Sequence, residues 1–350
     1  MPMRALQVKG SEQLRVADRP PRRRSMNAKF VCSCIVLLCA LLPIGAQAQA
    51  TPAKITIAIF VPPSLGAFLP PIIKANKFDA ANGLDITFVQ RPPDAYVTQF
   101  NSGEFQVGGS AATLTIAVAR NRGVPVTYLF NLFDFWGALV TSNNDVKTVK
   151  DLAGKQIAAA RVTTNFAMID WFARRQGLDM SKANVVNTAP PGLMSYAMAE
   201  RADAVQLWEP GYTQLLAKKP TVRTLDLDIR RQWREFAGGD SIPTLGVAAQ
   251  EAWVKQNAHL VQPLYSAYKA AAEWTRKNPA KAAALILPKA SSADQAAIQA
   301  LIENNDRLGI NVAGAAEIRK EIEAVFRAGV STKYLDKMPE AGAIYGSPLK

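Results

Sequence analysis

Hydroxyl-bearing side chains stand just before three expected helices, in loops that each follow an expected strand. The hydroxyls belong to Ser64, Ser110, Thr163 and Thr164, and the first two loops also contain the candidate ligand-binding glycines Gly66 and Gly109. The free N–H groups at a helix N-terminus, together with the helix dipole, favour an anion. A Ser or Thr before a helix is also the usual N-cap, so one such loop alone indicates little. Three of them together indicate an anion-binding site.

One cation, three aromatic side chains and one carboxylate accompany these loops. Arg161 is suited to paired hydrogen bonds with a sulfonate, carboxylate or nitrate, and the alternative is a solvated surface arginine. Phe135, Trp136 and Trp208 are expected to close over a ligand, with core packing as the alternative. Glu209 is expected to accept from an amino group of the ligand, and the alternative is a salt bridge or a carboxylate at a helix N-terminus.

These loops belong to a strand–helix pattern that occurs twice. In the first round, the apolar pattern predicts strands over residues 55–59, 84–88, 105–107 and 124–130, and helices over 69–78, 94–100 and 111–122. The second round predicts strands over 156–160, 185–186, 204–207 and 222–227, and helices over 165–176, 193–201 and 212–217. Such alternation implies right-handed β–α–β units. We therefore predict an α/β fold of two lobes, each a mostly parallel sheet flanked by helices.

Two apolar stretches are the expected crossings between the lobes, residues 137–141 and 243–248. The mostly helical tail after them is expected to return to the first lobe. We predict a first lobe made of residues 51–139 plus 246–350, and a second lobe made of residues 140–245. Two crossings make a hinge with a cleft between the lobes. In open parallel sheets, ligands lie beyond the carboxyl ends of the strands, which here face that cleft.

The first 50 residues have the features of a secretory signal peptide. An apolar run over residues 30–44 is shorter than the roughly 20 residues that span a bilayer, and basic residues precede it. Small-x-small cleavage patterns end at Ala48 and Ala50. We predict cleavage near one of these residues and export to the periplasm. Met26 is a second candidate start, which would give a signal of ordinary length.

The composition after residue 50 excludes several kinds of chemistry. The last cysteine is Cys39 and the only histidine is His259. A chain cut near Ala50 therefore lacks a thiolate nucleophile, a histidine triad and the usual zinc ligands, and we predict no enzyme activity, no metal and no cofactor. The first 50 residues hold eight Lys or Arg and two Asp or Glu, so +7 of the formal charge of +13 remains after them. This is a mild bias towards anionic ligands, without a nucleic-acid-binding motif.

Five segments carry a resemblance to a known family: KITIAIFVPPS, FQVGGSAATLTIAVARNRGVPV, GALVTS, VKDLAGKQIAAA and ADAVQLWEPG. In them the chain is similar to periplasmic substrate-binding proteins of the nitrate, sulfonate and taurine ABC importers, the NMT1-like group. The resemblance covers nearly the whole chain after the leader. The family commonly has an Asp and a Thr-Gly pair after the third strand. Residues 106–110 of this chain, QVGGS, have neither the Asp nor the Thr-Gly pair. That departure leaves the ligand open.

The resemblance implies the type II periplasmic binding protein fold and the solute-binding component of an ABC importer. Such a protein would close its lobes over a small organic anion, such as an alkanesulfonate or taurine, and deliver it to the permease and its ATPase. The second ligand hypothesis is an aromatic carboxylate or a pyrimidine. An enzyme on the same fold, as in pyrimidine or menaquinone pathways, is a different class of function, and a ligand-loaded signalling component is a third class. The chain has no long heptad pattern, so we expect a monomer.

Overall fold

The computed structural model describes residues 51–180 and 183–350, which belong to one compact unit of the chain. The predicted signal peptide, its cleavage site and the candidate start at Met26 lie outside the described residues. None of the described helices is long and apolar enough to cross a membrane.

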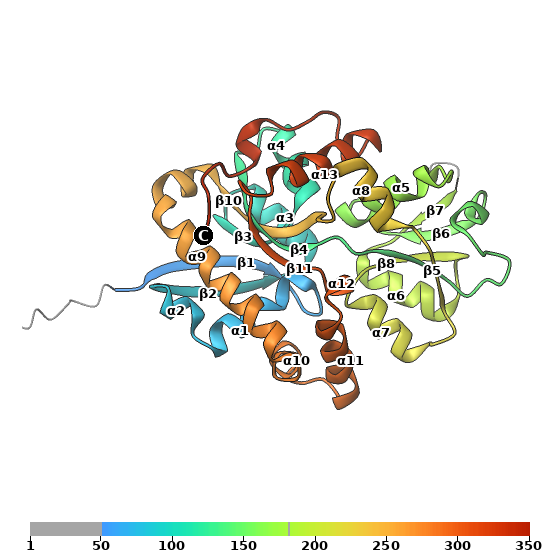
Figure 1. Cartoon of the computed structure of the whole chain (residues 1–350), viewed down its shortest axis with the longest axis horizontal. Helices are drawn as coiled ribbons and strands as arrows, with labels where there is room; N and C mark the ends of the chain where they lie inside the picture. The colour runs from blue at the N-terminus through green and yellow to red at the C-terminus, as the bar shows by residue number, and fades with distance from the viewer. Residues whose placement is uncertain (1–50, 181–182) are drawn as a thin grey trace, which may run out of the picture. The chain divides into compact units, whose positions relative to one another are not determined.

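The first sheet has six strands in the order β11-β4-β10-β3-β1-β2 (Figure 1). β1 is parallel to β2 and β3, whereas β10 is antiparallel to β3 and β4, and β11 is antiparallel to β4. The apolar residues that predict β1 are its buried ones, since Ile57 and Ile59 are almost fully covered. The strands are β1 (Ala53–Phe60), β2 (Leu84–Arg91), β3 (Val107–Ala112), β4 (Val126–Asp134), β10 (Pro243–Gln250) and β11 (Ile310–Gly314).

The second sheet has five strands in the order β7-β6-β8-β5-β9. β6 is parallel to β7 and β8, and β5 is antiparallel to β8 and β9. The strands are β5 (Ala138–Thr141), β6 (Gln156–Ala159), β7 (Asn184–Asn187), β8 (Ala204–Leu207) and β9 (Arg223–Leu225). In both sheets the parallel strands are followed by helices, as the sequence pattern predicts.

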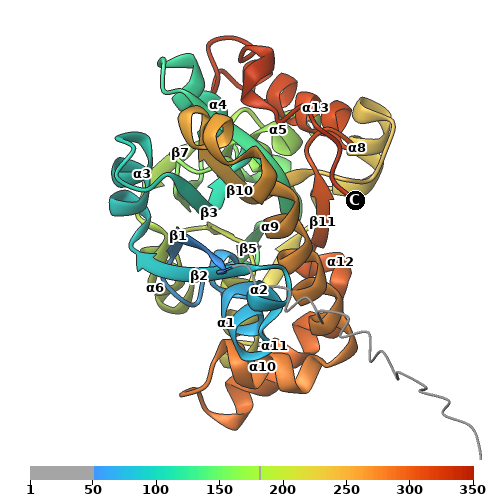
Figure 2. The same cartoon turned by 90° about the vertical axis from the view of Figure 1, so that its left-hand side faces the viewer.

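Helices cover the sheets and form the C-terminal part of the chain. α9 packs against α1 and α2, and α13 packs against both α4 and α5 (Figure 2). The helices are α1 (Leu69–Ala75), α2 (Phe78–Ala81), α3 (Pro93–Asn101), α4 (Thr113–Asn121), α5 (Thr164–Arg175), α6 (Pro190–Ala199), α7 (Gly211–Lys218), α8 (Ile229–Ala237), α9 (Glu251–Lys277), α10 (Pro279–Ile286), α11 (Ser292–Glu303), α12 (Asn305–Leu308) and α13 (Arg319–Ser331). Short 3₁₀ helices lie at Leu65–Ala67, Val149–Leu152 and Ala341–Ala343.

The chain passes between the two sheets at two places that lie side by side. The first crossing consists of residues 135–137, between β4 and β5, and the second consists of residues 238–242, between α8 and β10. Phe135 N donates to Ile242 O at 2.7 Å, which joins the two crossings directly. The stretches expected to cross, residues 137–141 and 243–248, instead lie mostly in β5 and β10, at the ends of the crossings.

The hydrophobic core is continuous across this junction. One cluster of buried residues includes Ala111 and Leu114 from the first-sheet side together with Phe172 and Trp233 from the second-sheet side. Phe135, on the first crossing, stacks on Phe172 with ring centroids 5.7 Å apart. The crossings are therefore held in place by side-chain packing as well as by backbone hydrogen bonds.

Candidate functional site

α4 and α5 begin after strands that belong to different sheets, so their N-termini are candidates for a site shared by both sheets. α4 begins directly after β3 of the first sheet, and α5 begins after β6 of the second sheet. Thr163 is the N-cap of α5: its Oγ1 accepts from Phe166 N at 3.1 Å and donates to Ala160 O at 2.8 Å. The Thr163 hydroxyl is therefore used within the loop, as an ordinary cap.

The next hydroxyl of α5, Thr164 Oγ1, is buried and has no hydrogen-bond partner among the described residues. Thr113 Oγ1, at the first residue of α4, is buried as well: Thr164 is 2 % exposed and Thr113 is 0 % exposed. Thr113 lies beside the Tyr128 hydroxyl, which donates to Asn131 Oδ1 at 2.8 Å. Because buried polar atoms are almost always paired in native proteins, the Thr164 hydroxyl, which the described residues leave without a partner at a helix N-terminus, makes this place a candidate polar binding site.

β10 contributes another buried hydroxyl, Thr244 Oγ1, which has no hydrogen-bond partner among the described residues. The register pairs Leu245 with Ala112, so Thr244 lies opposite Thr113, where β3 gives way to α4. Thr113 and Thr244 are thus the next residues beyond the last pair of β3 with β10.

Tyr334 connects the first turns of α4 and α5. Its hydroxyl donates to Val162 O at 2.7 Å, just ahead of α5, and lies beside Thr115 in the first turn of α4. Burial raises the pKa of Tyr334, so the group is a neutral donor near pH 7. The two helix N-termini are thus held close to one another, although they come from different sheets. Sequence reasoning missed Tyr334, which lies in the tail far from both loops.

The loop residues expected from the first sheet have mainly structural contacts. Ser64 Oγ accepts from Gly66 N at 3.3 Å and caps the short helix Leu65–Ala67. Ser110 lies inside β3, not in a loop as expected, and its fully buried Oγ accepts from Phe60 N at 2.9 Å. A Cβ on Gly66 would lie 1.9 Å from Ser110 Oγ, and a Cβ on Gly109 would meet Ile57 and Tyr268. These glycines allow close packing of the β1 loop on β3.

The aromatic residues divide into core and partly exposed ones. Phe135 is buried against Phe172, and Trp208 packs at the edge of a buried cluster of the second sheet. Trp136 is half-buried, and its ring meets the Tyr212 ring edge-on at 4.7 Å. Arg161 is exposed, and its backbone N donates to Asn187 Oδ1 at 3.0 Å. Whether any of the predicted site residues contacts a ligand stays a prediction, and Arg161 and Trp136 keep exposed surface for such a contact.

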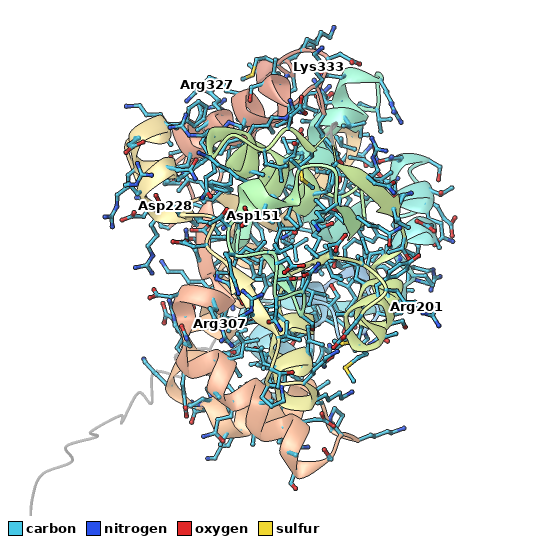
Figure 3. All side chains as sticks on the ribbon, turned by 90° about the vertical axis from the view of Figure 1, so that its right-hand side faces the viewer. Asp151, Arg201, Asp228, Arg307, Arg327 and Lys333 are labelled. Atoms are coloured by element: carbon cyan, nitrogen blue, oxygen red, sulfur yellow. The ribbon has the colours of Figure 1, made fainter. Side chains whose placement is uncertain are left out.

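Glu209 is 1 % exposed, and its carboxylate already has several partners (Figure 3 labels one of them, Arg307). Thr213 N donates to Oε2 at 3.1 Å, Thr213 Oγ1 donates to Oε1 at 3.0 Å, and Arg307 Nε lies 3.1 Å from Oε1. Burial raises the pKa of Glu209, and the Thr213 hydrogen bonds and the Arg307 charge lower it. Glu209 therefore forms the salt bridge that was the alternative to a contact with an amino group of the ligand.

A separate cavity of about 890 Å³ lies beside the two crossings, and we call it the hinge cavity. The ends of β4 and β9, the start of α8 and α12 form its walls. Its charged lining includes Asp134, Asp226, Arg230 and Arg307. Burial raises the pKa of Asp134 to about 6, and hydrogen bonds from Asn311, Ser241 and Asn131 limit the rise. None of the predicted loop residues at the α4 and α5 N-termini lines this cavity.

Groups of three or more His, Cys, Asp or Glu side chains that could hold a metal ion do not occur in residues 51–180 or 183–350. The single histidine, His259, is exposed on α9.

Residues 74–282 match the family described as NMT1/THI5-like, which is more than half of the chain, and the chain belongs to this family. This confirms the resemblance found in the sequence. No curated protein matches the chain in sequence.

Solved structures with the same fold share little sequence with this chain. The aliphatic sulphonate binding protein of Escherichia coli is 17 % identical with a TM-score of 0.66, covering 82 % of this chain and 95 % of its own. The alkanesulfonate-binding protein of Xanthomonas axonopodis pv. citri, bound to MOPS, is 17 % identical with a TM-score of 0.66, covering 85 % and 99 %. A Candida albicans protein described as having the generic periplasmic binding protein fold is 14 % identical with a TM-score of 0.60, covering 85 % and 97 %. The predicted fold class is therefore confirmed.

Proposed function

We propose that this chain is the solute-binding component of an ABC importer and that it holds a small organic anion between the first turns of α4 and α5. The observation that carries the proposal is the buried Thr164 hydroxyl at the start of α5, which has no hydrogen-bond partner in the described part of the chain, together with the buried Thr113 hydroxyl at the start of α4. The helices belong to different sheets, so a solute held by both would join the two halves of the fold.

The chemistry of this place suits an anion such as a sulfonate. Each helix N-terminus offers free backbone N–H groups and the positive end of the helix dipole. The threonine hydroxyls add donors that rotate to meet a ligand oxygen. An anion bound there needs no cationic partner, which fits the exposure of Arg161 outside the buried threonines.

The mechanism is closure of the two sheets over the solute about the two crossings. A solute that binds the closed arrangement better than the open one shifts the population towards it. The closed form would then be delivered to a permease and its ATPase in the membrane. The names of two similar structures refer to sulfonates, which supports an alkanesulfonate-like ligand over nitrate.

An aromatic carboxylate or a pyrimidine is a weaker second candidate. Of the aromatic residues expected to hold a ring, Phe135 is buried against Phe172, and the half-buried Trp136 and Trp208 both pack against the same cluster of the second sheet. Phe135 and Trp136 line the hinge cavity, and Trp208 does not. We propose no catalytic step, since the exposed His259 lies on α9, away from the two helix N-termini.

The test uses the full-length chain, expressed with its leader and recovered from the periplasm. Intact mass would locate the cleavage site, which we expect near Ala48 or Ala50. Isothermal titration would then compare ethanesulfonate, taurine, nitrate, benzoate and uracil. We expect the alkanesulfonate to bind most tightly. A response to benzoate or uracil alone would favour the second candidate, and turnover of any of these compounds would contradict the proposal.

A further inference from the structure

Arg307 connects the first-sheet part of the fold to the loop that follows β8 in the second sheet. It lies in α12, directly before β11, and its Nη2 donates to Thr213 Oγ1 at 2.7 Å. Its Nε lies 3.1 Å from Glu209 Oε1. A single side chain therefore contacts both ends of the turn that leads from β8 into α7.

Two aromatic rings enclose the Arg307 guanidinium. Its central carbon lies 5.2 Å from the Tyr212 ring centroid and 5.9 Å from that of Trp136. Trp136 belongs to the first crossing, whereas Tyr212 belongs to α7. Because cation–π attraction strengthens when water is excluded, the rings favour the same position of Arg307 that the carboxylate does.

Burial makes this contact costly to lose. Glu209 is 1 % exposed, and the side chain of Arg307 is 28 % exposed. If α12 moved away from α7, Glu209 would keep only its two hydrogen bonds from Thr213. The same movement would break the ion pair, the hydrogen bond from Arg307 to Thr213 and both ring contacts together, so these contacts favour the arrangement in which α12 lies against α7.

We propose that Arg307 is a positioning residue for solute retention, which latches the β8–α7 loop to α12 when the two sheets are closed and thereby slows solute release. The proposal rests on the proposed binding function and names a residue that acts without touching the solute. The neighbouring ion pair between Arg230 and Asp306 joins the same two parts of the chain, but both side chains are largely exposed. Exposed pairs contribute little, so of these two ion pairs the one made by Arg307 is expected to form the latch.

The experiment measures release kinetics and the separation of the two sheets. Residues 51–350 contain no cysteine, so Asp94→Cys on α3 and Arg201→Cys after α6 give two exposed, unique positions for spin labels. Ethanesulfonate is the probe, and its dissociation is followed by stopped flow. Arg307→Gln is expected to speed dissociation at least about tenfold and to change association less than about twofold. Without solute, it is expected to lengthen the distance between the labels.

Two further variants separate positioning from simple stability. Arg120→Gln is the matched control, since Arg120 is 14 % exposed and pairs with Glu251 within the first-sheet part. It should lower the melting temperature without changing release or label distance. Arg307→Lys keeps the charge but not the planar guanidinium that donates to Thr213, so it should restore part of the slow release.

The outcomes test the latch formed by Arg307 and the proposed binding function separately. If Arg307→Gln and Arg120→Gln behave alike in release and label distance, Arg307 is only a stabilising residue and the latch is wrong. If the unaltered protein does not bind ethanesulfonate or any other solute of the panel, the binding function fails. In that case the label distances without solute still decide whether Arg307 holds the sheets together.

Discussion

Asn311 Nδ2 donates to Asp134 Oδ2 at 3.0 Å, which ties the edge strand β11 to the point where β4 ends and the first crossing begins. The same amide group donates to Ser241 Oγ at 3.1 Å on the second crossing. Asp134 Oδ1 accepts from Asn131 Nδ2 at 2.9 Å. The carboxyl of Asp134 is therefore placed to connect β11, β4 and both crossings in one network.

Asp134 should make stability fall as the pH rises through about 6. Burial raises its folded-state pKa to about 6 from 3.8, so between these values the folded state binds more protons than the unfolded state. Its contribution is therefore most favourable below pH 4 and is lost as the pH rises through 6, by up to about 3 kcal/mol. Urea unfolding of the protein and of Asp134→Asn at pH 4.5, 6 and 7.5 measures the difference. A difference that does not change with pH would contradict this assignment.

Replacing Thr164 should affect the stability of the protein and its affinity for the solute in different ways. In Thr164→Val, the buried hydroxyl without a partner is replaced by a methyl group of similar shape, so the solute-free protein should be equally stable or more stable. Binding of ethanesulfonate should weaken roughly 10- to 100-fold, because a hydrogen bond to a charged group is lost. Thermal unfolding and titration check both effects.

Thr98→Val is the control for that variant. Thr98 is an exposed residue of α3, so its replacement should leave affinity unchanged. If Thr164→Val bound ethanesulfonate as well as Thr98→Val does, the anion site would have to lie elsewhere in the fold.

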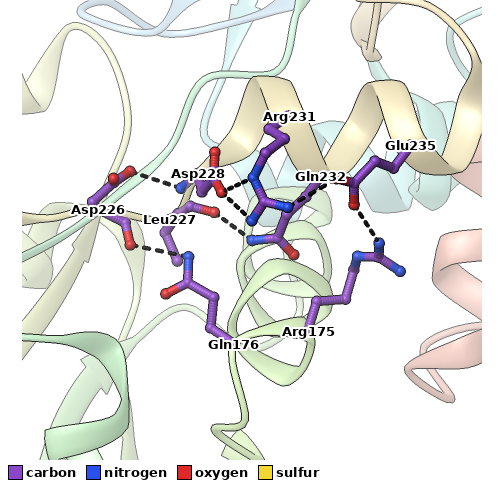
Figure 4. A network of polar contacts seen from close by, with 8 residues as sticks. All are labelled: Arg175, Gln176, Asp226, Leu227, Asp228, Arg231, Gln232 and Glu235. Carbon is purple, nitrogen blue, oxygen red and sulfur yellow. Dashed lines mark hydrogen bonds and ion pairs between the residues drawn. The ribbon is translucent and has the colours of Figure 1, made fainter.

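The strands and most helices follow from local patterns, and α8 has such a pattern although it was not among the expected helices: Ile229, Trp233 and Phe236 are spaced i, i+4, i+7 and pack on the core. Its sequence, IRRQWREFA, contains three arginines, and only Gln232 and Trp233 are buried. Its arginines are held by acids around it: Arg231 pairs with Asp228 and Glu235, and Arg175 of α5 also reaches Glu235 (Figure 4). The pairing with Arg175 joins α8 to the neighbouring helix, and no local pattern encodes that contact.

The candidate site was predictable only in part, because some of its contacts join residues that are far apart in the sequence. The Gly108 to Ser110 segment has the composition of a turn, yet it lies in β3, because Tyr96 and Tyr268 fill the space next to its glycines. Thr163 and Thr164 stand at a local strand–helix boundary, which composition reveals. Arg307 meets Glu209 only through the packing of α12, which no local pattern encodes.

Gly66 should be intolerant of a side chain. A Cβ there would lie 1.9 Å from Ser110 Oγ and 2.8 Å from Ser110 Cβ, so Gly66→Ala must displace the loop after β1 or the strand β3. We expect a loss of about 1–3 kcal/mol in the free energy of unfolding, measured with urea. Gly239→Ala should have little effect, since nothing lies within 4 Å of its added Cβ. Equal stability of the two variants would show that the β1 loop adapts freely.

Tyr334→Phe should loosen the start of α5. The change removes the hydrogen bond to Val162 O and should cost about 1 kcal/mol. Hydrogen exchange at residues 162–166 should become faster, because the loop loses its tie to the tail. Tyr345→Phe is the control, because the part of the chain that the structure describes gives its hydroxyl no hydrogen bond. Unchanged exchange at these amides would mean that Tyr334 contributes nothing to the order of this loop.

An ammonium group on the solute should bring no gain in affinity. Taurine differs from ethanesulfonate by a charged amino group, and the sequence indicates Glu209 as a candidate acceptor for it. Both oxygens of Glu209 are already engaged by Thr213 and Arg307, and the residue is almost fully buried. Because an ammonium group could reach Glu209 only by displacing Arg307 and its contacts, the site should bind ethanesulfonate at least as tightly as taurine. Titration of both compounds measures this, and taurine binding more than about tenfold tighter would require a free carboxylate at the site.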